Sequence, residues 1–143
     1  MTHLLGTILT SKGHEVCTVS GDTPVTDCIT KMCELNIGSI IVMDGDKVVG
    51  LFTEREAVRR IYLKEMNLQA TAVSTVMNPD FIPVTSQTTV GQAMDFFVNK
   101  RTRHLPVFED GKLSGMISIG DVTKWIIDQQ QNEIDHLSGY IHS

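Results

Sequence analysis

The sequence predicts a mixed α/β (α+β) fold in which two tandem β-α-β-β-α repeats pack with pseudo-twofold symmetry and are followed by a long C-terminal helix. Three observations carry this prediction. The 143 residues are 41% hydrophobic and 20% charged, which suits one compact unit or two small halves that share an interface. The chain aligns with itself at an offset of 65 residues, and each copy shows the same order of apolar patterns.

The self-alignment runs without a gap over the 40 pairs that begin at Val19 and end at Val58. Six pairs are identical, and many others match in chemistry, such as Ile40 with Leu105 and Leu51 with Met116. Thr53 aligns with Ser118. A continuous run of matched apolar positions indicates a duplication.

In the first copy, an extended segment at 16–19 precedes a helix that begins at Thr23, with Pro24 in the first helical position. The apolar face of this helix comprises Val25, Cys28, Ile29 and Met32. The runs 39–43 and 48–53 flank Asp44-Gly45-Asp46 and predict a hairpin. A second helix is expected over 54–65.

The second copy repeats this order, with an extended segment at 81–84 and a helix that begins at Thr89 with Gln92 as its capping-box partner. The apolar face of this helix comprises Val90, Ala93, Met94 and Phe97. The runs 104–109 and 113–118 flank Asp110-Gly111 and predict another hairpin. The closing helix is expected from Gly120 past Gln131.

The predicted organisation is an N-terminal segment (1–15), repeat 1 (16–65), a linker (66–80), repeat 2 (81–130) and a C-terminal helix extension (131–143). A repeat of this size buries little surface alone, so the repeats should pack together and form a ligand cleft between them. In the C-terminal helix, Ile127, Ile134, Leu137 and Ile141 recur at heptad-like spacing. This spacing fits either a seam against a partner subunit or a helix folded on its own domain.

Composition excludes several function classes. The net charge of −5 opposes non-specific binding to nucleic acid or anionic lipid, but it allows a small anionic ligand at a local basic cluster. No run is long enough to span a bilayer, no signal peptide is recognisable, and the expected location is cytoplasmic. The histidines show no metal-ligand spacing, and Cys28 is expected to be a small buried hydrophobe.

The most specific local pattern is a hydroxyl residue at a strand end with a carboxylate three positions later, as in Thr53–Glu56 and Ser118–Asp121. One interpretation is structural, because this spacing forms a helix capping box. The other is functional. A helix N-terminus with a hydroxyl can hold a phosphate, and the carboxylate can accept hydrogen bonds from a ribose diol.

A second pattern is the basic stretch 99–104, in which Arg101, Arg103 and His104 precede a central strand of an acidic protein. These side chains are either solvated or bind phosphate, to which arginine is well suited. The equivalent stretch of the first copy, 36–39, has no positive charge, so the two potential sites are unequal.

The duplicated units, the GhhSxxD-like ending 115–121 and the RHLPV lead-in 103–107 together resemble a tandem pair of cystathionine-β-synthase (CBS) domains. The resemblance covers the chain from about Lys12 to Val122 and beyond. It is strongest to stand-alone two-CBS proteins of bacteria and plant organelles, which share the start at 12–16 and the turns at 53–55 and 118–121.

The resemblance implies a non-catalytic module that binds AMP, ADP, ATP or NAD(H) between its repeats, without metal, and signals energy or redox state to an unknown regulated protein. It also implies a homodimer, with a tetramer as the alternative. Carried over by position, the first site would use the following residues: Asp121, Ser118, Met116, Arg103, Thr18, Thr23, Ile37 and Gly38. The pseudo-symmetric site would use the following: Glu56, Thr53, Leu51, Ser39, Arg55, Thr88, Thr102 and Pro83.

The chain departs from the family pattern at Glu56, where Asp is usual, so we expect the Asp121 site to bind more strongly. Two other functions stay open. Ser118, His104 and Asp121 have the side-chain types of a catalytic triad, but Ser118 lacks a nucleophile elbow. The basic stretch 100–104 could serve a ligand-free interaction scaffold or a nucleic-acid-binding module, although it offers few phosphate contacts.

Overall fold

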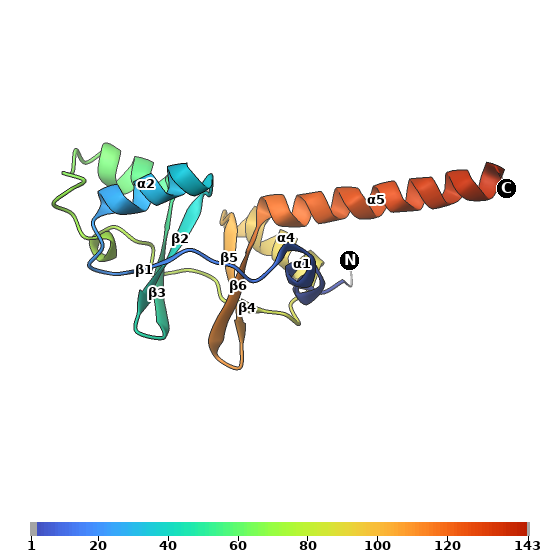
Figure 1. Ribbon diagram of the computed structural model, residues 1–143, viewed down its shortest axis with the longest axis horizontal. Coiled ribbons are helices and arrows are strands. Elements are labelled where there is room, and N and C mark those ends of the chain that lie inside the picture. Colours follow the sequence, from blue (N-terminus) through green and yellow to red (C-terminus); the bar gives the residue numbers. More distant parts are fainter. Residues whose placement is uncertain (1–2, 143) are drawn as a thin grey trace.

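The computed structural model, which describes the backbone of residues 3–142 and the side chains of residues 3–139, places two three-stranded sheets side by side (Figure 1). The first repeat contains the following elements: β1 (Thr18–Ser20), α2 (Val25–Leu35), β2 (Ser39–Asp44), β3 (Lys47–Thr53), α3 (Glu54–Glu56) and η1 (Ala57–Tyr62). The second contains these: β4 (Val84–Thr85), α4 (Val90–Asn99), β5 (His104–Glu109), β6 (Lys112–Ser118) and α5 (Ile119–His142). The predicted strand-helix-strand-strand-helix order is therefore confirmed.

The two sheets have the same topology and register. In each, a short strand runs parallel to the first strand of an antiparallel hairpin, as β1 does beside β2 and β4 beside β5. Ser39 pairs with Thr53 and His104 pairs with Ser118, at the predicted offset of 65 residues. Even the register irregularities correspond, at Val42/Met43 and at Val107/Phe108. Such agreement confirms the duplication at the level of the backbone.

A shared hydrophobic core joins the two repeats. Ile41, Val48 and Leu51 of the first sheet pack with Met116 of the second, and Phe81 and other partly buried side chains complete the cluster. These strands lie beside one another in Figure 1. The repeats therefore face each other through their sheets, and the strand ends of both repeats open onto the same region.

The segment that precedes each repeat packs on the other repeat. Residues 5–12 form a helix, α1 (Leu5–Lys12), whose Leu5, Ile8 and Leu9 are buried in the core of repeat 2. Likewise, Val73 and Val76, in and next to the short 3₁₀ helix η2 (Val73–Thr75), are buried in the core of repeat 1. The repeats are thus linked by an exchange of entry segments.

Several local expectations need adjustment. Pro24 occupies the N-cap of α2 rather than its first helical position, and the closing helix of repeat 1 continues as the π-helix η1. The N-terminal segment contains a helix that its amino-acid pattern did not predict. The domain bounds 16–65 and 81–130 stay a prediction, and each omits the entry segment that its core receives.

The C-terminal helix α5 projects away from the two repeats (Figure 1). The seam residues Ile127, Ile134 and Leu137 are 57%, 55% and 59% exposed, so this face is not folded onto its own domain. Ile141, the last position of the seam, lies outside the described side chains. In the part of the chain that the structure describes, no helix combines the length and apolarity that a membrane span requires.

Candidate functional site: two unequal clefts between the repeats

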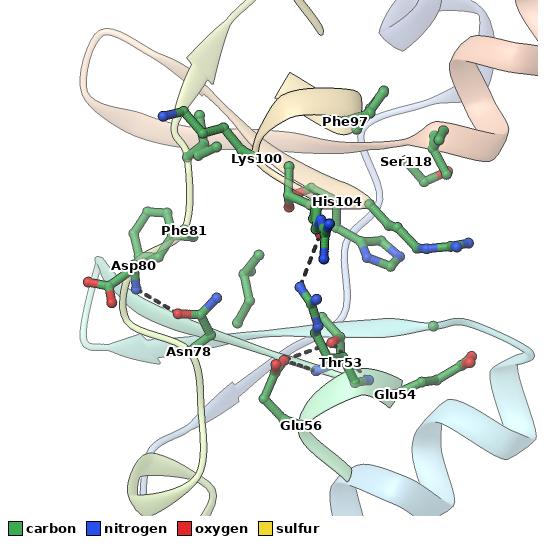
Figure 2. A pocket seen from close by; sticks show the side chains of 18 of the residues that line it. Thr53, Glu54, Glu56, Asn78, Asp80, Phe81, Phe97, Lys100, His104 and Ser118 are labelled. Carbon is green, nitrogen blue, oxygen red and sulfur yellow. Dashed lines mark hydrogen bonds between the residues drawn. The ribbon is translucent and has the colours of Figure 1, made fainter. Parts of the chain in front are cut away.

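A cavity of about 1020 Å³ lies where the end of β3 meets the loop before β5. Figure 2 shows Thr53, Glu54 and Glu56 of repeat 1 on one wall and Phe97, Lys100 and His104 of repeat 2 on the other. The end of the linker, with Asn78 and Asp80, and the start of repeat 2, with Phe81 and Ile82, close a third side. We call this cavity the Glu56 pocket.

A second cavity of about 300 Å³ occupies the pseudo-equivalent position. It lies between the end of β6, with Met116, Ser118 and Asp121, and the segment 36–39 of repeat 1. The opening segment of repeat 1, 15–17, and Lys12 at the end of α1 complete its lining. We call this cavity the Asp121 pocket.

The hydroxyl–carboxylate pairs form capping boxes in both repeats. The backbone N–H and the hydroxyl of Thr53 donate to Glu56 Oε1 at 3.0 and 2.7 Å, and Glu56 is only 5% exposed. The backbone N–H of Ser118 donates to Asp121 Oδ2 at 2.8 Å, and the N–H of Asp121 donates to Ser118 Oγ at 3.1 Å. The structural interpretation of this spacing is therefore confirmed, while the unused carboxylate oxygens stay available for a ligand.

The Glu56 pocket has a cationic lining. Five lysines and arginines line it against three carboxylates, one of which, Glu56, is buried in its capping box. The cations are Arg55, Arg59, Lys100, Arg101 and Arg103. Apolar surface is also present, from Leu51, Phe81 and Ile82. Such a lining suits an anionic ligand that carries an apolar group.

Arg101 of this cluster has an unusual backbone. Its φ is 52°, in the left-handed region, as is that of the equivalent residue, Asn36. Asn tolerates this conformation much better than Arg does. The carbonyl of Arg101 accepts a hydrogen bond from Arg55 Nη1 at 3.0 Å, which ties the cationic loop of repeat 2 to repeat 1.

The carboxylate of the Asp121 pocket already has a cationic partner. Lys12 Nζ donates to Asp121 Oδ2 at 2.6 Å and to the carbonyl of Met116 at 2.6 Å. Burial alone would raise the pKa of Asp121, but the hydrogen bonds from Lys12 and Ser118 outweigh it and hold this pKa below its ordinary value. Asp121 is therefore ionised and paired at neutral pH.

His104 lies at the boundary between the two pockets and lines both. Its ring faces Gly38, where a Cβ would come within 3.5 Å of Nε2. Burial lowers the pKa of His104 from 6.5 to about 4, against the opposing effect of Asp121. The ring is therefore neutral at pH 7 and contributes an uncharged surface to both pockets.

The structure divides the candidate residues among three regions. The Asp121 pocket gathers Asp121, Ser118, Met116, Ile37, Gly38 and also Ser39, which was assigned to the other site. The Glu56 pocket gathers Glu56, Thr53, Leu51, Arg55, Thr102 and also Arg103, which was assigned to the Asp121 site but does not line that pocket. Thr18 and Thr23 instead line a separate shallow depression beside α2. Thr88 contacts the entry segment through its carbonyl, and Pro83 is exposed just before β4.

Sequence reasoning did not assign roles to Lys12, Asn78 and Phe81, which line the pockets. Lys12 reaches Asp121 across 109 residues of sequence, and no local pattern signals such a contact. Phe81 could have been found, because it aligns with Val16 at the repeat offset and both precede the short parallel strands.

Among the described residues, no group of three His, Cys, Asp or Glu side chains could hold a metal ion. Cys28 is fully buried, as expected, and this burial raises the pKa of its thiol to about 11. The thiol is therefore un-ionised at neutral pH.

The CBS domain family model matches residues 8–63 and 73–128. The mitochondrial CBS domain-containing protein CBSX3 of Arabidopsis thaliana is 32% identical over 125 residues, 84% of this chain and 61% of the relative, so the chain spans less than two thirds of that protein. A solved structure of a protein with CBS domains from Burkholderia ambifaria is 36% identical with a TM-score of 0.85, covering 89% of this chain and 96% of that one.

The fold is also shared with CBSX2 in complex with AMP, at 20% identity and a TM-score of 0.72, covering 90% of this chain and 98% of that one. The family model covers both repeats together with most of α1 and all of η2, the segments that the repeats exchange. The duplicated sheets, the paired capping boxes and these matches lead to one conclusion: the chain belongs to the CBS-domain family and contains two CBS domains.

Proposed function

We propose that this protein is a non-catalytic regulatory module that binds an adenine nucleotide (AMP, ADP, ATP or NAD(H)) between its two CBS domains. One observation carries the proposal: a cationic cavity with an apolar side lies between the repeats, at the N-terminus of the helix that follows β3. The complex of CBSX2 with AMP shows that a protein with this fold holds such a ligand.

The pocket chemistry supports separate places for the parts of a nucleotide. Arg55 and Arg103 supply guanidinium groups for phosphate. Leu51 and Phe81 supply apolar surface for the base. The second carboxylate oxygen of Glu56 has no hydrogen bond within the described residues and could accept from a ribose hydroxyl.

The contacts around the triad-like residues support the absence of catalysis. Ser118 Oγ accepts from the backbone N–H of Asp121, and Asp121 pairs with Lys12. No side-chain hydrogen bond joins Ser118 to His104 among the described residues. A serine nucleophile would need a base within hydrogen-bond reach.

The exposed seam of α5 supports the predicted homodimer. Ile127, Ile134 and Leu137 are more than half exposed on a projecting helix. Tyr62, the equivalent of Ile127 in repeat 1, is 77% exposed. A second copy would cover such positions, and sedimentation velocity of the wild-type chain beside Ile134→Asp measures whether it does. The regulated partner and the cytoplasmic location stay predictions.

A thermal-shift panel with AMP, ADP, ATP, NAD and NADH tests nucleotide binding. A ligand at one hundred times its dissociation constant stabilises the folded state by roughly 2.7 kcal/mol, so we expect the midpoint to rise by about 5–10 °C. Titration calorimetry then gives the affinity and the stoichiometry. No shift and no heat with any of these compounds would refute the proposal in favour of an interaction scaffold.

A further inference from the structure

The two entry segments make equivalent hydrogen bonds to opposite repeats. Leu5 N–H donates to the carbonyl of Thr88 at 2.8 Å, and Val73 N–H donates to the carbonyl of Thr23 at 2.9 Å. Gly6 and Ser74 continue the pattern, donating to Ser86 and Gly21 at 3.0 Å each. The entry segments therefore correspond at an offset of 68 residues, whereas the repeats correspond at 65.

The difference of three residues lies between each entry segment and the strand that follows it. In the N-terminal copy these residues extend α1 to Lys12, whereas the equivalent helix η2 is only three residues long. The longer helix carries the Lys12 side chain to the Asp121 pocket. Among the described residues no cation pairs with Glu56, which accepts hydrogen bonds from the backbone N–H and the hydroxyl of Thr53.

The position of Lys12 is well determined by packing. Leu9, one turn earlier on α1, fills the space that a side chain at Gly115 would need, since a Cβ there would approach Leu9 Cδ1 to 2.6 Å. The last turn of α1 is therefore pressed against β6. The ammonium group also satisfies the carbonyl of Met116, so it is held at two points.

Lys12 competes directly with a ribose. Asp121 Oδ2 already accepts from the N–H of Ser118, and the ammonium group of Lys12 is a second donor to the same atom. A ribose diol donates two hydrogen bonds to one carboxylate. With Lys12 on Oδ2, only Oδ1 of Asp121 is left for the ribose, and the negative charge of the carboxylate is already paired. The pocket volume of about 300 Å³ is also at the lower limit for ligand sites.

We propose that Lys12 is a tethered occupant of the Asp121 pocket that excludes the ribose of a nucleotide from Asp121, so that the Glu56 pocket fills first. This inference rests on the proposed function, because it assumes that both pockets recognise adenosine compounds. Lys12 is then the residue that makes the two pockets unequal in nucleotide affinity. The ion pair with Asp121 is the competing interaction that a second nucleotide must displace.

Calorimetric titration of Lys12→Met with adenosine and with AMP tests this inference. Adenosine carries no phosphate, so for this ligand Lys12 acts only as a competitor for Asp121. We expect the second site to bind both ligands roughly three- to tenfold more tightly than it does in the wild-type chain. Adding Asp121→Asn should remove this second site again.

The matched controls are Lys112→Met, which removes an exposed lysine of β6 outside both pockets, and Lys12→Arg, which keeps a cation at the position. Both should bind as the wild-type chain does. Circular dichroism checks that the variants fold, and Leu5, Ile8 and Leu9 keep the packing of α1 in each of them.

Three results would overturn the inference. Unchanged binding of both ligands by Lys12→Met would mean that Lys12 does not obstruct the pocket. Unchanged adenosine binding with weaker AMP binding would mean that Lys12 is a phosphate ligand. If neither the wild-type chain nor any variant binds an adenosine compound, the proposed function falls together with this inference, whereas the first two results leave that function standing.

Discussion

The Glu56 pocket and the Asp121 pocket share one backbone plan but differ in size, charge and occupancy. Both lie at the end of a hairpin strand with a capping box, and their residues correspond at an offset of 65. One is about 1020 Å³ and cationic, and the other is about 300 Å³ and holds Lys12. Duplication thus preserved the sheets, while the loops and entry segments that border them diverged.

His104 allows the largest test of this comparison, because the equivalent position in repeat 1 is Ser39. The folded pKa of His104, about 4, is below its unfolded value of 6.5, so the unfolded state binds more protons between these values. Stability should therefore fall as the pH decreases, by on the order of 2 kcal/mol between pH 7.5 and pH 5.

Urea unfolding at both pH values measures this change, and His104→Ser should flatten the dependence whatever its own stability. The lowered pKa of Asp121 acts only below about its ordinary value of 3.8, so it does not affect this window. An equal pH dependence in the variant would show that another group titrates.

The carboxylates provide the second test. Glu56 is 5% exposed and accepts two hydrogen bonds from Thr53, so Glu56→Ala leaves two partly buried donors of Thr53 without their partner. We expect a loss of about 2 kcal/mol in the free energy of unfolding. Asp121→Ala should lose about half as much, because its side chain is 25% exposed and water can replace it. Chemical denaturation of the two variants in parallel reveals whether this order holds.

The guanidinium groups provide the third test. Arg103→Ala removes a cation from the Glu56 pocket. It breaks no side-chain hydrogen bond among the described residues, so the fold should be unaffected. We expect the affinity for AMP to fall about tenfold, which corresponds to about 1.4 kcal/mol. Lys47→Ala, in the exposed hairpin of repeat 1, is the control. Titration calorimetry that returns equal affinities for both variants would remove Arg103 from the site.

Arg101 provides the smallest and most discriminating test. Its φ of 52° favours Asn, the residue that stands at the equivalent position 36. Arg101→Asn should therefore stabilise the fold by about 0.5–1 kcal/mol, while AMP binding weakens. Thermal unfolding with and without AMP measures both effects. A variant that is more stable and binds AMP equally well would show that Arg101 has no part in binding.

Much of the fold could be predicted from local patterns, because the capping residues, the hairpin turns and the apolar periodicity act over a few residues. Thr89 with Gln92 forms the predicted capping box, and both hairpins have the predicted turns. The helix α1 was not predicted, because its burial depends on the core of repeat 2. For the same reason the sequence predicted that the Asp121 site binds more strongly than the Glu56 site, because no local pattern shows that Lys12 already pairs with Asp121. The order proposed from the structure is the reverse.

Because the repeats exchange entry segments, neither repeat is a complete folding unit by itself. A fragment that contains only residues 16–65 would lack Val73 and Val76, which are 0% and 2% exposed in the core of that repeat. The first sheet of this fragment would be exposed to water at the place where Val73 and Val76 pack in the intact chain. The core of each CBS domain thus contains the entry segment of the other domain, and we expect the two domains to unfold in a single cooperative step. A recombination event that moved residues 16–65 alone would separate this core from Val73 and Val76, so we expect only the pair to fold in a new protein.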